Sequence, residues 1–203
     1  ISSTGIFTLG DSFIVSESVS DLEQRIKQVI NGDKDKDQLN SEFKLGKNYA
    51  EWITGQKQHR NFDKELIKKF TYRPFDIRYT YFDKSFIWRL REKVTHNFLK
   101  DNLALNIGRQ GSVVGSMPWS LCLITSSMVD LNLYYRGGEQ VFPLYVYHDD
   151  GTRTPNFKQS TLSRFTTNLQ QAYEPKDVLD YTYAILHSPH YRKRYEDYLK
   201  NDY

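Results

Sequence analysis

The sequence predicts an α+β fold with a central mixed β-sheet, flanking helices and a helical C-terminal end. Apolar runs of strand length, rich in β-branched and aromatic residues, occupy the middle of the chain between glycine, proline or polar clusters. From Ser160 onward the apolar residues recur instead at about 3.6-residue spacing, which is the period of an amphipathic helix. Strands in the middle followed by helices at the end indicate the α+β class.

The N-terminal third predicts two short strands and two helices. Residues 4–16 mix apolar side chains with two glycines, which indicates two strands separated by a turn. A helix then begins at a capping-box pattern, Ser20 with Glu23, and its apolar residues keep helical spacing until Asn31-Gly32. We interpret the charged residues 33–38 as a loop, and a second helix is predicted around Trp52, ending near Gly55.

The remaining elements alternate less regularly. Residues 70–82 predict a strand, a turn at Pro74 and another strand, and a short helix is predicted around residues 94–99. The central sheet is predicted from the apolar runs 103–107, 121–125 and 141–147. The C-terminal helices are predicted at 160–172, 175–187 and 190–201, because Pro175 and Pro189 each suit a first helical turn.

Composition places the chain among ordinary globular proteins. It has 38% hydrophobic and 26% charged residues, and 15% of its residues are aromatic. A single cysteine, Cys122, excludes an internal disulfide and a cysteine-based zinc site, and we expect it to be buried.

No apolar run is long enough to span a membrane and no signal peptide opens the chain, so we expect a soluble, cytoplasmic protein. A first residue of isoleucine and an end within a helical pattern suggest an excised fragment.

Positive charge is concentrated in the middle of the chain. Residues 57–109 carry 13 Lys and Arg against 6 Asp and Glu, whereas residues 1–56 have a net charge of −3 and residues 110–203 one of −1. A polyanion-binding face needs such an excess, because contacts from Lys and Arg to phosphates provide most non-specific DNA affinity. A merely solvated basic face explains the same excess.

A search for catalytic motifs finds none. The sequence contains no glycine-rich phosphate loop, no H-E-x-x-H or C-x-x-C metal spacing and no G-x-S-x-G nucleophile motif. The five histidines are dispersed, and Asp149-Asp150 lies before Gly151 in a pattern typical of a solvated turn. We therefore predict neither catalytic nor metal-binding residues in this chain.

The informative pattern combines arginines with aromatic residues. It consists of Tyr72-Arg73-Pro74-Phe75-Asp76-Ile77-Arg78-Tyr79, then Trp88-Arg89-Leu90-Arg91-Glu92-Lys93 and His96. Guanidinium groups bind phosphate or guanine with two hydrogen bonds, and aromatic rings offer stacking surfaces. Alternatively, Asp76 pairs with Arg73 or Arg78 and the tyrosines are ordinary strand residues. A second polar cluster, residues 106–112, follows an apolar strand and ends in a glycine-rich loop of the kind that often recognises ligands.

These patterns, together with four further blocks, resemble the C-terminal specificity domain of Type ISP restriction-modification enzymes and related adenine DNA methyltransferases. The further blocks, in the family's order, are residues 102–105 with Arg109-Gln110, 141–145, 183–189 and 191–192. Thr4-Gly5 and Asp11-Ser12-Phe13 resemble the segment that joins the methyltransferase domain. The resemblance implies a connecting segment at residues 1–20 and a target-recognition domain at residues 21–203, helical from about residue 160.

The resemblance also implies a division of labour with the rest of a longer chain. The partner would be double-stranded DNA, held against an adjoining methyltransferase domain that uses S-adenosylmethionine. The methyltransferase's Asn/Asp-Pro-Pro-Tyr/Phe motif and a glycine-rich cofactor loop are absent here, so we expect no cofactor in this chain and place catalysis upstream.

Residue chemistry then selects the candidate contacts. The candidates for reading base edges are Arg89, Arg91, Arg109 and Gln110. Those for phosphate or water-mediated contacts are Lys93, His96 and Ser112, and Arg73 and Arg78 are further DNA-binding candidates for which a structural role stays open. Two other readings remain: an interaction module that docks onto a methyltransferase or helicase, and a nuclease with a magnesium-binding carboxylate cluster.

Overall fold

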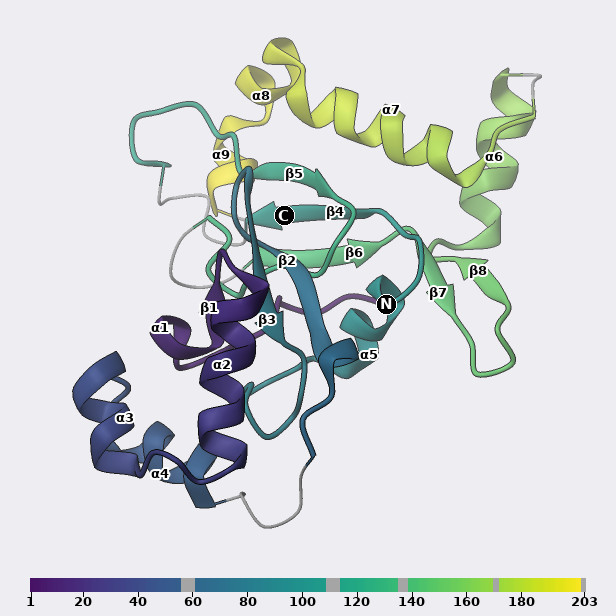
Figure 1. The fold of residues 1–203 in the computed structure, drawn as a ribbon. Helices are drawn as coiled ribbons and strands as arrows, with labels where there is room; N and C mark the ends of the chain where they lie inside the picture. The colour runs from purple at the N-terminus through teal and green to yellow at the C-terminus, as the bar shows by residue number, and fades with distance from the viewer. Residues whose placement is uncertain (56–60, 109–113, 135–138, 170–171, 202–203) are drawn as a thin grey trace. The chain divides into compact units, whose positions relative to one another are not determined.

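The computed structural model describes residues 1–55, 61–108, 114–134, 139–169 and 172–201 (Figure 1). The chain divides into two compact units that interleave along the sequence. Unit 1 comprises Ile1–Gly5, Arg91–Ser127 and Leu131–Tyr203, and unit 2 comprises Ile6–Leu90 and Met128–Asp130.

Unit 2 combines helices with a three-stranded antiparallel sheet of order β1-β3-β2. Its strands are β1 (Val15–Ser16), β2 (Ile67–Arg73) and β3 (Asp76–Tyr81). Its helices are α1 (Asp11–Ile14), α2 (Val19–Ile30), α3 (Lys36–Phe43), α4 (Lys47–Gly55) and the 3₁₀ turn η2 (Lys64–Leu66). The core is aromatic, since Phe13, Tyr49, Phe70, Tyr81 and Phe86 are all almost completely buried.

Local signals explain where the helices of unit 2 begin. The cap of α2 is Ser18, whose hydroxyl accepts from the backbone N–H of Asp21 (3.3 Å), so the predicted cap at Ser20 was wrong by two residues. Asp35 and Gln38 form a complete capping box at the start of α3, so part of the predicted loop 33–38 is helical. The prediction of two strands in residues 4–16 was only partly right, because Val15–Ser16 forms β1 but Asp11–Ile14 forms α1.

Unit 1 carries the second three-stranded antiparallel sheet, of order β5-β4-β6, and a separate two-stranded ribbon. The strands are β4 (Ala104–Gly108), β5 (Cys122–Thr125), β6 (Glu139–Pro143), β7 (Tyr145–Tyr147) and β8 (Arg153–Pro155). The helices are α5 (Glu92–Thr95), the 3₁₀ turn η3 (His96–Phe98), α6 (Gln159–Leu169), α7 (Pro175–His187), α8 (Pro189–Arg194) and α9 (Glu196–Asn201). Figure 1 shows α7 running along the edge strand β5, against which it packs.

Trp119 is at the centre of the core of unit 1. It clusters with Leu105 and Cys122 of the sheet, with Leu179 of α7 and with Leu199 of α9. The C-terminal helices therefore contribute apolar side chains to the same core as the sheet. Burial raises the pKa of the Cys122 thiol to about 12, which makes it an unreactive core residue, as predicted.

The predicted α+β class is confirmed, but the sheet arrangement differs from the expected central mixed sheet. In the described ranges the named strands form three small antiparallel sheets. The predicted run 141–147 divides at Leu144 into β6 and β7, and the predicted helix 190–201 divides at Tyr195 into α8 and α9. The helix predicted at 175–187 has those bounds in the structure. Among the described residues, no helix is both long and apolar enough to cross a membrane.

Candidate functional site

The β2–β3 hairpin of unit 2 holds the first pair of predicted arginines. Pro74 and Phe75 form its two-residue turn between the paired residues Arg73 and Asp76. Proline fixes φ near −65°, which excludes the turn types that match the natural twist of a hairpin. The strand register shifts between Thr71 and Arg73, so the strands accommodate this turn through an irregularity at Tyr72.

Tyr72 organises both arginines of the hairpin. The guanidinium carbons of Arg73 and Arg78 lie 3.8 and 4.7 Å from the centroid of its ring. The tyrosine hydroxyl donates to the carboxylate of Asp11 at 2.9 Å. Burial and this hydrogen bond raise the pKa of Tyr72 to about 12, so the hydroxyl stays protonated and remains a donor.

The guanidinium groups of Arg73 and Arg78 both form ion pairs with carboxylates. Nη1 of Arg73 donates to Oδ1 of Asp130 at 2.7 Å, and the side chain of Asp130 is only 2% exposed. Nε of Arg78 donates to both carboxylate oxygens of Asp76 at 3.0 Å, and its Nη2 lies 3.5 Å from Glu17. The structure thus brings Arg73 and Arg78 together, with their charges compensated inside the unit.

A distant segment of the chain supplies Asp130. Residues 128–130 belong to unit 2, where Val129 forms a parallel bridge with Thr71 and Asp130 forms one with Ile6. These bridges continue the backbone pairing beyond the named strands and bring Asp130 to Arg73, which lies 57 residues earlier in the sequence.

Arg89 is the predicted base-reading residue that falls in unit 2. Its backbone exchanges two hydrogen bonds with Phe7, each 3.0 Å long, which fixes the main chain at this point. Its side chain is exposed, and within the described ranges it forms no ion pair with a carboxylate. Arg89 therefore combines a fixed backbone with an available guanidinium group.

Arg91 and Lys93 lie in unit 1, at the start of α5. Arg91 caps this helix in the left-handed conformation, with φ of 59°, and its Nε is buried with no hydrogen-bond acceptor in the described part of the chain. Lys93 is exposed on α5. Neither side chain pairs with a carboxylate among the residues whose positions are described, so both retain an uncompensated positive charge.

His96 is held by backbone carbonyls. Its Nδ1 lies 2.6 Å from the carbonyl oxygen of Glu92, and its Nε2 lies 3.4 Å from that of Tyr147. Behind it, the buried amide of Asn97 accepts from the backbone N–H of Tyr147 and donates to the carbonyl of Val94. His96 thus links η3 to β7, and its ring is less available than the side chain of Lys93 to contact a ligand.

The predicted loop residues Arg109, Gln110 and Ser112 lie outside the described residues, and β4 ends directly before them. Gly108 ends β4 and donates its N–H to the carbonyl of Leu121 at 2.8 Å. A Cβ atom at position 108 would lie 2.6 Å from that of Leu121, so the close approach requires glycine.

The C-terminal helices contact the segment that follows this loop. Nζ of Lys200 donates to the carbonyl of Gly115 at 3.1 Å, and the guanidinium of Arg192 lies 5.7 Å from the ring centroid of Trp119. These contacts place α8 and α9 beside residues 115–119.

Helix α8 carries a further group of cations that the sequence patterns did not indicate. Arg192, Lys193 and Arg194 follow one another on α8, and the side chains of Lys193 and Arg194 are exposed. Arg192 donates to the carbonyl of Leu186 at 2.5 Å and lies 3.0 Å from Nδ1 of His187. Three consecutive cations were visible in the sequence, but this part of the chain has a net charge near zero.

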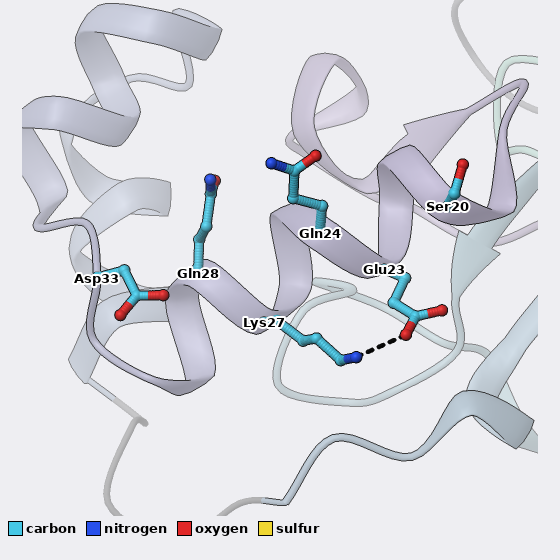
Figure 2. Close-up of a pocket in the computed structure, with 6 residues that line it drawn as sticks. All are labelled: Ser20, Glu23, Gln24, Lys27, Gln28 and Asp33. Carbon is cyan, nitrogen blue, oxygen red and sulfur yellow. Dashed lines mark hydrogen bonds and ion pairs between the residues drawn. The ribbon is translucent and has the colours of Figure 1, made fainter.

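The hollow beside α2 has few features of a binding site. It is lined by Ser20, Glu23, Gln24, Lys27, Gln28 and Asp33. Figure 2 shows its cation, Lys27, hydrogen-bonded to Glu23, and the distance is 2.6 Å. The bond to Lys27 is the main reason why the pKa of Glu23 is lowered.

In the described ranges, no three His, Cys, Asp or Glu side chains gather closely enough to hold a metal ion.

A sequence model of one protein family, the Type ISP C-terminal specificity domain, matches residues 1–203. The chain belongs to this family. It is therefore a Type ISP C-terminal specificity domain. No curated protein matches the chain.

Solved structures share the fold of this Type ISP specificity domain over its whole length. A DrdV–DNA complex has a TM-score of 0.78 at 22% identity, and covers 100% of this chain. The Type ISP enzyme LlaBIII bound to DNA gives 0.73 at 20% identity, and a nuclease-deletion mutant of the Type ISP enzyme LlaGI with a DNA substrate mimic gives 0.70 at 22%, both again over 100% of this chain. The match covers only 20%, 14% and 19% of those three chains, respectively.

Proposed function

We propose that this Type ISP specificity domain binds double-stranded DNA and sets the sequence specificity of a restriction-modification polypeptide. The observation that carries the proposal is that Arg91 and Lys93 of unit 1, and Arg89 of unit 2, pair with no carboxylate among the described residues of this specificity domain. Phosphate contacts from such cations provide affinity, and bidentate arginine contacts to guanine provide discrimination.

The relatives support this proposal by what their structures contain. DrdV, LlaGI and LlaBIII were each solved with DNA or a DNA mimic. Arg109, Gln110 and Ser112 remain candidate contacts, as does His96, and Lys193 and Arg194 are additional candidate phosphate contacts. Arg73 and Arg78 are the weakest candidates, because a phosphate would have to compete with carboxylates already bound to them.

The proposal extends to the rest of the polypeptide. An adjoining methyltransferase domain would bind S-adenosylmethionine and methylate adenine in cytoplasmic DNA, while this domain selects the sequence. The absence of catalytic motifs from the sequence and the small share of the related chains that the domain spans support this separation.

The test measures DNA affinity and methylation preference of the intact parent polypeptide. We expect affinity to fall steeply between about 50 and 200 mM salt, with a slope of about 0.9 per phosphate contacted. Arg91→Ala and Arg109→Ala should each relax sequence preference by about 1–3 kcal/mol per lost bidentate contact.

Three outcomes contradict parts of the proposal. Unchanged preference in both variants would show that other residues read the bases. Affinity that barely responds to salt would favour an interaction module that does not read DNA. Magnesium-dependent DNA cleavage by the purified domain would identify it as a nuclease instead.

A further inference from the structure

The turn of the β2–β3 hairpin exposes an aromatic side chain almost completely. Phe75 is 89% exposed, and Ile77, two residues later, is 52% exposed. Pro74 between the strands is exposed as well. In the described part of unit 2, this turn is therefore an apolar projection.

Phenylalanine is an unfavourable choice for this backbone position. Phe75 has φ of 65°, in the left-handed region that glycine and asparagine adopt most readily. Proline followed by a residue with positive φ is the pattern of a type II turn, whose third position is normally glycine. Because the ring is also solvent-exposed, it contributes little to the stability of unit 2. A role in binding a partner would explain why phenylalanine occupies this position.

The supports beneath the turn fix its conformation. Arg73 and Arg78, on either side of the turn, both lie against the ring of Tyr72, and Tyr72 is hydrogen-bonded to Asp11. A side chain presented on a pre-organised turn loses little conformational entropy when it binds.

The charges around the turn are unfavourable for DNA. Arg73 lies 2.7 Å from Asp130 and 4.0 Å from Asp11, and Arg78 lies 2.9 Å from Asp76 and 3.5 Å from Glu17. Among the described residues, these ion pairs bring four carboxylates close to two guanidinium groups, so the six groups together carry a net negative charge. A phosphate backbone would be repelled there, whereas a protein surface with a basic rim would be attracted.

We propose that the β2–β3 turn is a docking element through which Phe75 inserts into an apolar pocket with a basic rim on another domain of the parent polypeptide. This inference rests on the proposed function in so far as a longer restriction-modification chain surrounds the domain. The domain spans 20% or less of each solved relative, so most of such a chain is potential docking surface. Insertion of an aromatic anchor into a pocket is the contact that dominates many protein interfaces.

The first experiment places a photo-cross-linking phenylalanine analogue at position 75 of the intact parent polypeptide. After irradiation with and without DNA, mass spectrometry identifies the cross-linked partner. We expect a cross-link to another domain of the same chain in both conditions. A cross-link to DNA would overturn the inference, because it would show that Phe75 inserts into DNA. The absence of any cross-link, or a cross-link only to a second polypeptide, would overturn it as well.

The second experiment uses Phe75→Gly, which removes the ring and suits the positive φ. In the intact parent we expect amide hydrogen exchange in residues 72–78 to accelerate about tenfold, the effect of losing one anchoring aromatic side chain. If the turn is not docked, glycine relieves the backbone and exchange stays the same or slows. The control is Lys44→Gly, since Lys44 is exposed and has φ of 54° but presents no apolar group.

Failure of this inference is distinguishable from failure of the proposed function. Arg91→Ala tests DNA reading and should leave the cross-link at position 75 unchanged. A parent that shows the protein cross-link but no salt-dependent DNA binding would retain the docking element and refute the DNA-reading proposal alone.

Discussion

Arg73 and Arg78 lie within ion-pair distance of carboxylates, whereas Arg89, Arg91 and Lys93 have none among the described residues. In the sequence both groups look alike, since each consists of cations beside aromatic residues. The structure separates them by what surrounds each guanidinium. A paired arginine beside a buried carboxylate contributes to the fold, while an unpaired cation at the surface gains most from an external anion.

The largest effect should come from breaking the buried pair. Arg73→Met removes the cation that lies 2.7 Å from the carboxylate of Asp130, whose side chain is 2% exposed. We expect the free energy of unfolding to fall by about 2–3 kcal/mol, less than for a fully buried pair because Arg73 itself is 35% exposed. Chemical denaturation of the purified domain measures this.

The double variant Arg73→Met, Asp130→Asn is the control. It removes the charge that the single variant leaves buried, so more than half of the lost stability should return. If the double variant is as unstable as the sum of both single variants, the pair contributes nothing specific to stability and the comparison fails.

Much of the fold was predictable, and the errors have identifiable causes. The helix 175–187 and the strand pair around Pro74 were predicted because strong periodicity coincides with proline signals. Helix α3 was missed because Leu39 is its only buried residue, although Asp35 and Gln38 provided a capping signal. The single sheet was wrong because strand spacing alone does not determine which strands pair.

The candidate site was less predictable than the fold. Residue types identified the arginines, but not which of them are compensated. Asp76 is close to Arg78 in sequence, and the possibility of this pair was considered from the sequence alone. Asp130 is 57 residues from Arg73 and reaches it through backbone pairing that no local pattern reveals. The near-complete exposure of Phe75 was not predicted either, although a turn was predicted at the neighbouring Pro74.

A matched pair of substitutions sharpens the comparison at the level of binding. Arg89→Gln in the intact parent should weaken affinity for its DNA site about tenfold, because it removes an uncompensated guanidinium. Arg78→Gln should change DNA affinity by less than about twofold and stability by less than about 1 kcal/mol, since its ion pairs are partly solvent-exposed. Fluorescence anisotropy with labelled duplexes measures both, and equal losses would remove the distinction between the two groups.

The smallest expected effect is on the pH dependence of stability, through His187. The imidazole of His187 lies 3.0 Å from the guanidinium of Arg192, which also donates to the carbonyl of Leu186. Burial, and then the positive charge of Arg192, lower the pKa of His187 below 6.5. As the pH falls below about 6.5, the unfolded chain therefore takes up this proton before the folded chain does, and stability declines until the lowered pKa is passed. His187→Gln should flatten that part of the stability curve, measured by denaturation at several pH values between about 7.5 and 5. Arg192→Met should flatten it only in part, because burial is the larger cause. If the stability of both variants depends on pH as steeply as that of the wild type, the lowered pKa of His187 does not cause this pH dependence.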